Sequence, residues 1–412
     1  MKNKKNVLWI ALITMAIIHV YAQQYDSEKD FHIKNVNNEV EIIEYIGSKR
    51  EVHIPPSIQN KPVTEIGDEA FFKNKNITSI IIPDSVTSIG KGAFYGCANL
   101  TSVTIPSSVT SIGNGAFSEC TSLTSVTIPY SVTSIGEKAF YSCSSLSSIN
   151  IANSVTNIGN EAFESCTSLT SITIPKSVIN IGEKTFSNCT KLVAINVASG
   201  NANFSSDQGI LYNHNKTAII QYPAGKTDST FSIPDSVTVV MYYAFLGCSN
   251  LTIINIPKSI ISIETGAFSS CNKLTEINVA SDNTQFSSEQ GLLYNHNKTV
   301  LIRYPTEKKE INFNIPNSVT SIGNSAFKDC YSLESVTVPN SVKSIGYTAF
   351  DGCTSLTSVK FEGMITSGNL NGNAFGFHYE NDNYIGNLRI KYLMGGIGTY
   401  TRKRGGYTWE KQ

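Results

Sequence analysis

Apolar and polar positions follow one pattern that recurs with a period of about 23 residues across most of the chain, from residue 68 to 362. Within one unit, Val103 and Ile105 alternate with polar neighbours, which predicts a short strand with one buried face. Pro106 ends this strand because proline cannot donate a hydrogen bond to a sheet ladder. A second short apolar stretch, a glycine and a helical turn follow. Each unit is therefore predicted to form one closed coil.

A phenylalanine and a cysteine hold fixed places in most units, three positions apart. The members that we expect to form a ladder in the core are Phe94, Phe117, Phe140 and Phe163, with Cys97, Cys120, Cys143 and Cys166. A single coil of about 23 residues cannot bury its own apolar side, whereas stacked coils can. The predicted fold is a right-handed parallel solenoid, mostly β, with about fourteen coils whose strands lie about 4.8 Å apart.

Two segments, at about 197–232 and 279–314, interrupt the regular spacing and are near copies of each other. Each reads as a strand, a polar turn and a second strand, which predicts a β-hairpin that widens one coil and projects from it. His214 and His296 occupy matching places at the two turns. Neither has an acidic or thiol partner nearby in the sequence, so we expect solvated turn residues. A ligand or metal role for the two histidines is the alternative.

The pattern weakens toward both ends of the chain. Residues 23–67 read as an N-terminal cap with a degenerate first coil, because terminal repeats face solvent on one side. Residues 363–412 leave the repeat and are rich in tyrosine and basic residues. We expect this tail to cap the last coil and its open sheet edge. The alternative is a segment that attaches the protein to an acidic polymer of the cell envelope.

The N-terminal segment, residues 1–22, has the parts of a secretory signal peptide. Three lysines precede an apolar stretch of about fourteen residues, which is too short for a membrane-spanning helix of about 20. Ala22 ends a small-residue cleavage site. We therefore expect a secreted or cell-surface protein with no transmembrane segment in the mature chain. A retained membrane anchor is the alternative.

Charged residues make up only 16% of the chain, and the formal net charge is +0. The polar surface is therefore supplied largely by Ser, Thr and Asn. A neutral chain lacks the basic surface that nucleic acids require, so we expect no nucleic-acid partner.

Nine cysteines in an exported protein would ordinarily suggest disulfides. Here all nine share one phase of the repeat, so their side chains should point in parallel into the core. Their Cβ atoms would then lie about one strand spacing apart, beyond the mean of about 3.8 Å in disulfides. We expect a reduced, buried ladder. A zinc site is disfavoured because a linear column cannot form a tetrahedral cage.

The sequence lacks the common motifs of hydrolases, zinc proteases, phosphate-binding loops and dinucleotide-binding folds. The outward positions of the predicted strands carry mostly hydroxyl groups, with no obvious general acid, base or nucleophile. We therefore expect no enzymatic activity, no cofactor and no metal.

The unit SVTSIGKGAFYGCANLTSVTIP and the inserted GILYNHNKTAIIQYP resemble the BspA-like class of leucine-rich repeat proteins. The resemblance covers about residues 42–362. As in that subtype, the cysteine precedes the strand segment by three positions, as Cys97 precedes Leu100. The resemblance implies a leucine-rich-repeat solenoid in a surface or secreted protein. It also implies an association with adhesion to host matrix proteins and with contact between microbial cells.

We therefore expect an exported, non-enzymatic adhesion or recognition protein that binds a host-matrix or other cell-surface protein through its repeat surface. Tyrosine is enriched at the energetic centres of interfaces. The candidate contact residues are Tyr212, Tyr222, Tyr294 and Tyr304 in the inserts, with Ser102, Thr104, Ser125, Thr127, Ser171 and Thr173 on the strand face. A glycan-binding module and a passive structural spacer of a surface layer are the alternatives.

Overall fold

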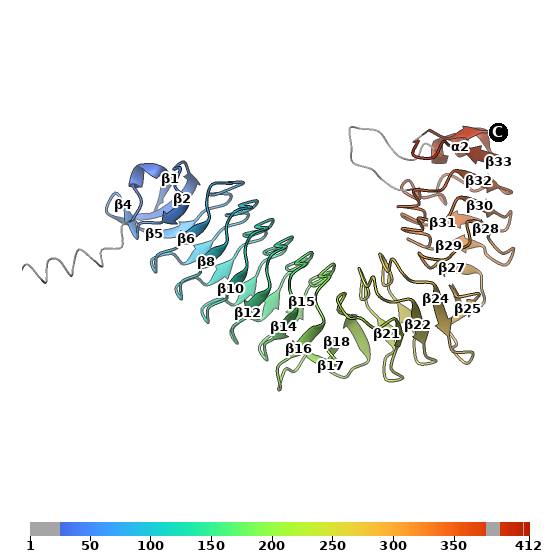
Figure 1. The fold of residues 1–412 in the computed structure, drawn as a ribbon, viewed down its shortest axis with the longest axis horizontal. Helices are drawn as coiled ribbons and strands as arrows, with labels where there is room; N and C mark the ends of the chain where they lie inside the picture. Colours follow the sequence, from blue (N-terminus) through green and yellow to red (C-terminus); the bar gives the residue numbers. More distant parts are fainter. Residues whose placement is uncertain (1–24, 376–387, 407) are drawn as a thin grey trace, which may run out of the picture.

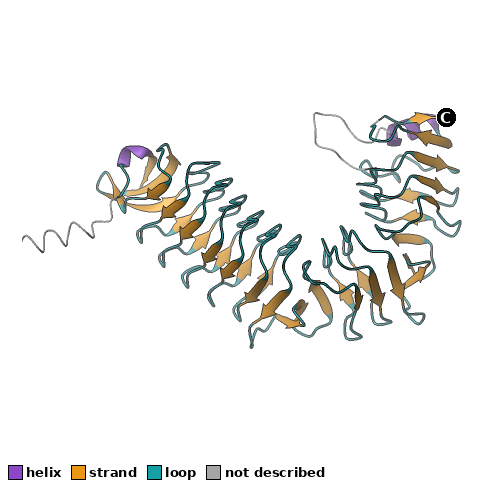
Figure 2. Ribbon diagram, in the orientation of Figure 1, coloured by secondary structure: helices purple, strands orange, loops and turns teal. Residues whose placement is uncertain are grey.

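The structure is a computed structural model that describes residues 25–375, 388–406 and 408–412. Figures 1 and 2 show short strands and turns stacked coil upon coil along an arc, with β1 (Phe31–Val36) near one tip and β33 (Gly398–Thr401) near the other. The predicted solenoid of about fourteen coils, each of about 23 residues, is confirmed. The expected signal peptide at residues 1–22 lies outside the described residues.

Each regular coil contributes a longer strand and a short strand to two separate ladders. Before the first insert the longer strands are β3 (Glu51–His53), β6 (Ser79–Ile81), β8 (Ser102–Thr104), β10 (Ser125–Thr127), β12 (Ser148–Asn150), β14 (Ser171–Ile174) and β16 (Ala194–Val197). The short-strand ladder contains β5 (Lys61–Ile66), β7 (Ser88–Ile89), β9 (Ser111–Ile112), β11 (Ser134–Ile135), β13 (Asn157–Ile158) and β15 (Asn180–Ile181).

Equivalent ladders form after each insert, in separate sheets. The longer strands there are β20 (Thr230–Ser232), β22 (Ile253–Ile256), β24 (Glu276–Val279), β28 (Asn312–Asn314), β30 (Ser335–Val338) and β32 (Ser358–Phe361). The short strands are β21 (Val239–Val240), β23 (Ser262–Ile263), β29 (Ser321–Ile322) and β31 (Ser344–Ile345). Pairing between neighbouring coils is parallel and in register; Ser125, for example, pairs with Ser102.

A third ladder runs along the turns that close each coil. The Phe94 amide donates to the Ala116 carbonyl of the next coil at 2.7 Å, and the Phe117 amide donates to the Ala139 carbonyl at 2.8 Å. Within each turn, backbone hydrogen bonds join residues three positions apart, as in the predicted helical turn. Residues in the left-handed backbone conformation, such as Glu119 with φ 60°, prevent these turns from extending into a helix.

The phenylalanines form one stacked column inside the coils. Phe94, Phe117, Phe140 and Phe163 are fully buried. Ring centroids of successive members lie 5.1 to 5.5 Å apart, within 7° of parallel. The column runs from Phe71 to Phe186 and starts again at Tyr222 and at Tyr304, inside the two inserts. Within each run of the column, the stacked and buried rings help to hold neighbouring coils together.

The cysteines form a second buried column beside the rings, and all nine are free thiols. Each donates its thiol hydrogen to a backbone carbonyl of the preceding coil; Cys97 donates to Phe71 at 3.0 Å and Cys143 donates to Phe117 at 3.1 Å. Asn74 takes the place of cysteine in the first coil, and its side-chain oxygen accepts from the amides of Asn76 and Ile77. The small thiol donor at this position therefore satisfies a carbonyl inside each coil junction.

Each insert contains the predicted hairpin together with one further strand. The strands are β17 (Phe204–Asp207), β18 (Ile210–Asn213) and β19 (Ala218–Gln221) in the first insert, and β25 (Phe286–Glu289), β26 (Leu292–Asn295) and β27 (Val300–Arg303) in the second. All neighbours within an insert are antiparallel. However, β19 and β27 also pair in parallel with β21 and β29. The hairpins are therefore part of the solenoid wall, and the expectation that they project from it is corrected.

Additional elements cover both ends of the solenoid. At the N-terminal end, η1 (Glu28–Asp30) leads into the antiparallel pair β1 (Phe31–Val36) and β2 (Glu39–Tyr45). Strand β2 pairs with β5, and the short β4 (Ser57–Ile58) flanks β5. These strands bury the first face of the stack, and Tyr45 extends the ring column by stacking on Phe71 at 5.3 Å.

At the C-terminal end, β33 (Gly398–Thr401) pairs antiparallel with β32, and β34 (Glu410–Lys411) adds to β33. The helix α2 (Leu388–Gly395) places Tyr392 over Phe361, with 4.1 Å between ring centroids. The Arg402 guanidinium donates to the carbonyls of Leu356 and Cys353 in the last coil. The basic tail therefore satisfies carbonyls that have no further coil to bond.

Candidate functional site

The outward side chains of the longer strands form a polar surface, which we call the strand face. Ser102 and Thr104 flank the buried Val103 on β8, and the same arrangement recurs one coil later on β10. The predicted contact residues Ser102, Thr104, Ser125, Thr127, Ser171 and Thr173 are all exposed and lie on this face. Parallel pairing of β6, β8, β10 and β12 aligns equivalent residues in rows along the arc.

A neighbouring row of exposed hydroxyl groups forms hydrogen bonds between consecutive coils. Thr101 donates to the Thr78 carbonyl at 2.9 Å, and Thr124 donates to the Thr101 carbonyl at 3.3 Å. Ser147 continues the series by donating to Thr124 at 3.2 Å. These bonds tie each coil to the preceding one, which explains why Thr or Ser recurs at this phase. This row stabilises stacking, whereas the strand face beside it presents its side chains to solvent.

Side-chain amides join the hydroxyl groups on the later coils. The Asn255 amide donates to the Ser232 hydroxyl at 2.9 Å, and the Asn278 amide donates to the Asn255 side-chain oxygen at 3.3 Å. On the coils after the second insert, Ser335 donates to the Asn312 side chain at 2.6 Å. Apart from exposed charges such as Glu276 on β24 and Lys360 on β32, the face therefore offers neutral donors and acceptors in rows with a spacing of about 4.8 Å. Such an array can make many neutral hydrogen bonds to a long partner.

The four insert tyrosines are buried, and the expectation that they contact a ligand is corrected. Tyr212 and Tyr294 are each 3% exposed, and Tyr222 and Tyr304 are each 1% exposed. Burial raises the pKa of Tyr212 and of Tyr294 to about 12. These side chains belong to the core of the widened coils.

Tyr222 and Tyr304 are buried because they continue the phenylalanine column. The Tyr222 ring stacks on Phe245 with 5.3 Å between centroids, and the Tyr304 ring stacks on Phe327 at 5.2 Å. Cys248 donates to the Tyr222 carbonyl, as other cysteines donate to phenylalanine. The constant separation between an aromatic residue and the cysteine of the next coil is the sequence signal that could have placed both tyrosines in the core.

The two turn histidines are exposed, and the ring of each makes one bond to the insert backbone. The His214 ring donates from Nδ1 to the Asn201 carbonyl at 3.1 Å, and His296 does the same to Asn283 at 3.0 Å. In the described part of the chain, no three His, Cys, Asp or Glu side chains are grouped to hold a metal ion.

Two buried asparagines that the sequence analysis missed anchor the inserts. The Asn201 amide donates to the carbonyls of Pro175 and Val178, and its oxygen accepts from the amides of Asn203 and Phe204. Asn283 makes the equivalent four bonds in the second insert. The signal was available, because asparagine stands at the same place in both copies.

The cysteine column has no features of a reactive or metal-binding site. Burial raises the pKa of Cys97, Cys189 and Cys271 to about 12, so these thiols stay protonated at neutral pH. A thiolate is the form that acts as a nucleophile or binds metal. The column is therefore a structural feature of the coil junctions.

A groove lined by the turns that close the early coils is a second candidate contact surface. It has a volume of about 440 Å³, and Phe72 and Tyr95 lie in its wall with polar residues around them. The two rings stack with 5.2 Å between centroids, and Phe72 is 45% exposed. An aromatic surface beside polar groups is suited to contact with a sugar ring or with an apolar side chain.

Among the described residues, no helix is both long enough and apolar enough to cross a bilayer.

Comparison with protein families finds six copies of the BspA type leucine-rich repeat region, at residues 64–193, 224–312 and 306–385. No curated protein matches the sequence significantly.

Two solved structures resemble the chain along most of its length. A leucine-rich cell surface protein of Faecalibacterium prausnitzii is 31% identical, covers 83% of this chain and 96% of its own, and superposes with a TM-score of 0.59. The pneumococcal vaccine antigen PcpA is 25% identical, covers 81% of this chain and 79% of its own, and has a TM-score of 0.58. Both structures share their overall fold with this chain.

Proposed function

The chain belongs to the BspA-type leucine-rich repeat family, and from that premise we propose that it is an exported adhesion or recognition protein without enzymatic activity. Its partner would be a protein of the host matrix or of a neighbouring microbial surface, and the contact would be made by the strand face. Export would depend on the signal peptide expected at residues 1–22.

The observation that carries this proposal is the alignment of exposed hydroxyl groups on consecutive coils. Ser102, Ser125 and Ser148 occupy one row, and Thr104 and Thr127 lie in the row beside them. Each neutral hydrogen bond contributes only about 1 kcal/mol net, so an extended partner that spans many coils would be needed for tight binding. Rows that repeat along an arc suit such a partner better than a small molecule, which is bound in a concave pocket.

The test uses the chain from residue 23 onward and immobilised fibronectin, laminin, collagen and fibrinogen. The variant with three lysines on the strand face, T104K, T127K and T173K, should bind the partner protein with an affinity at least about tenfold lower, because docking would bury unpaired charges. The control variant carries S107K, N153K and S236K, which add the same charge at exposed turn residues. Equal binding by both variants would contradict the proposal, and so would the absence of binding to any of these proteins or to microbial surface proteins.

A glycan-binding role is the second candidate, and the groove at Phe72 and Tyr95 favours it. An array of glycans would separate the two functions. Binding to glycans that is lost in F72A but kept in the strand-face lysine variant would support the glycan role. Failure to bind either class of ligand, with retained association to the envelope, would favour the passive spacer.

A further inference from the structure

The second insert forms a coil that is shorter on its turn side than the coil after it. The turn side is the segment that leads from the strand paired with the short-strand ladder to the aromatic residue of the ring column. Leu301 pairs with Ile322, and the Tyr304 amide donates to the Ala326 carbonyl at 2.7 Å. Tyr304 therefore stands in the column that Phe327 occupies one coil later. Three positions separate Leu301 from Tyr304, whereas five separate Ile322 from Phe327. The turn side of the insert coil is consequently two positions shorter.

A cavity of about 120 Å³ lies where the coil is short. Residues 263–269 of the preceding coil and 323–325 of the following coil form its walls, and Ile302 and Arg303 of the insert also line it. The cavity is thus a consequence of joining a short coil to two full ones.

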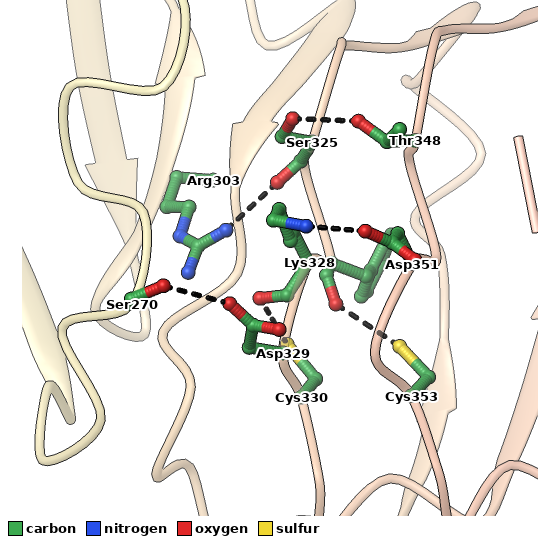
Figure 3. A network of polar contacts seen from close by, with 10 residues as sticks. Ser270, Arg303, Ser325, Lys328, Asp329, Cys330, Thr348, Asp351 and Cys353 are labelled. Atoms are coloured by element: carbon green, nitrogen blue, oxygen red, sulfur yellow. Dashed lines mark hydrogen bonds and ion pairs between the residues drawn. The ribbon is translucent and has the colours of Figure 1, made fainter. Parts of the chain in front are cut away.

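Arg303 is the cationic residue of this cavity, and it is only 4% exposed. Its Nη1 donates to the Ser325 carbonyl at 2.7 Å (Figure 3). Its Nε and Nη2 are buried and have no hydrogen-bond partner among the described residues. These two nitrogens lie on one edge of the guanidinium, and their N–H bonds point in parallel. That edge matches the two oxygens of a carboxylate in a bidentate pair.

The acids around Arg303 are directed to other partners. Figure 3 shows Asp329 nearby, where its carboxylate accepts from the Ser270 hydroxyl at 3.1 Å. Glu264 lines the cavity and accepts from the Ser262 hydroxyl at 2.8 Å. Lys328 is paired with Asp351. Neither the Asp329 nor the Glu264 carboxylate forms an ion pair with Arg303 in the described part of the chain, and a buried guanidinium without an ion pair is unfavourable. The two nearby carboxylates would repel a dianion, so a monoanion suits the cavity better.

The first insert provides an internal comparison, because Gln221 occupies the position of Arg303 there. Gln221 is also 4% exposed, and its amide donates to the carbonyls of Tyr222 at 3.1 Å and Ala244 at 3.2 Å. Glutamine is therefore compatible with this place in a short coil and is satisfied by the backbone. Arginine at the same place presents two donors that the described part of the protein does not use.

We propose that the cavity beside Arg303 binds a monoanionic carboxylate group through the Nε and Nη2 donors. This site is separate from the strand face and does not depend on the proposed adhesion function. The carboxylate could belong to a small free acid or to the C-terminal end of a polypeptide.

The test is thermal unfolding of the chain from residue 23 onward, with acetate replacing chloride at constant ionic strength and pH 7. Acetate should raise the midpoint of the intact protein, and R303Q should remove that rise because it copies the residue of the first insert. The apparent affinity for acetate should fall at least about tenfold in R303Q. K309Q, which removes an exposed cation in the same segment, should respond to acetate like the unaltered protein.

Two further arms identify the source of the carboxylate. Glycylglycine should compete with acetate if a polypeptide end fits the cavity, and its C-terminal amide should not. If acetate binds and glycylglycine does not compete with it, the site is assigned to small free acids. The proposal is overturned if R303Q and the unaltered protein respond equally to acetate. It is also overturned if a crystal structure in saturating acetate shows the Nε and Nη2 donors paired with Asp329 or with water alone.

Discussion

The Cys120 thiol donates to the carbonyl oxygen of Phe94, which belongs to the preceding coil and lies 3.1 Å away. Successive cysteines repeat this bond from coil to coil, so one residue type both fills the core and joins each coil to the one before it. The bond explains why cysteine, a small apolar residue that can also donate, recurs at one phase. Asn74 holds the same place in the first coil, where its side-chain oxygen instead accepts from two amides of its own turn.

Replacing Phe163 by alanine should lower the free energy of unfolding by about 3–5 kcal/mol, as for other buried aromatic residues. Phe163 is fully buried and stacks between Phe140 and Phe186, with centroids 5.5 and 5.8 Å away. Urea unfolding followed by circular dichroism would measure the change. The control is F72A, which truncates a ring that is 45% exposed and should have a smaller effect. A loss below about 1 kcal/mol for F163A would show that the ring column is not the stabilising core.

Titration with a thiol reagent should find the cysteines unreactive in the native protein at pH 8. Burial holds the pKa of the Cys97 thiol at about 12, and the other cysteine side chains are also buried. In denaturant all nine should react, because each is a free thiol. Eight oxidised cysteines in the denatured sample would contradict the ladder of reduced thiols.

Stability should fall as the pH rises above about 9. A thiol in the unfolded chain has its ordinary pKa of 9.0, whereas burial raises the pKa of Cys189 to about 12. The unfolded state therefore loses a proton that the folded state keeps, and stability present below pH 9 is lost progressively toward pH 12. In this range, each such thiol should lower the free energy of unfolding by about 1.4 kcal/mol for every pH unit.

The variant C189S isolates this effect because serine does not ionise there. Its unfolding free energy should fall less steeply between pH 9 and 11 than that of the unaltered protein. T190S, a change at an exposed neighbour, should leave the slope unchanged. Identical slopes for C189S and the unaltered protein would mean that the thiol is not held protonated by burial.

Removal of residues 388–412 should cause concentration-dependent association, visible by light scattering. The deletion uncovers the edge of β32 and the Phe361 ring, and exposed edges pair with other chains. The control is the double variant K391Q/K403Q, which removes two exposed charges and keeps the cap. If this variant stays monomeric but loses envelope association, the tail is an attachment segment. If the deletion stays monomeric, the capping role is wrong.

The regular coils could be predicted from the sequence because one spacing encodes both the buried rings and the turn that follows. The inserted coils could not, since Tyr222 lies three positions after Ile219, whereas Phe117 lies five positions after Ile112. Tyr222 lies 23 residues before Phe245, and Tyr304 lies 23 residues before Phe327, but the shorter spacing from the preceding strand conceals that both belong to the ring column. The polar turn by itself predicts a projecting hairpin with exposed tyrosines, whereas these side chains are buried. Burial of Arg303 was likewise hidden, because only the shortened turn side of its coil creates the cavity.

Photo-crosslinking tests most directly whether the strand face is the surface that binds a protein partner. A benzophenone amino acid at Thr127, exposed on β10, should crosslink to the bound partner, and the same amino acid at the exposed turn residue Ser236 should not. Crosslinks that form only from Ser236, or from neither position while the complex is intact, would contradict the account.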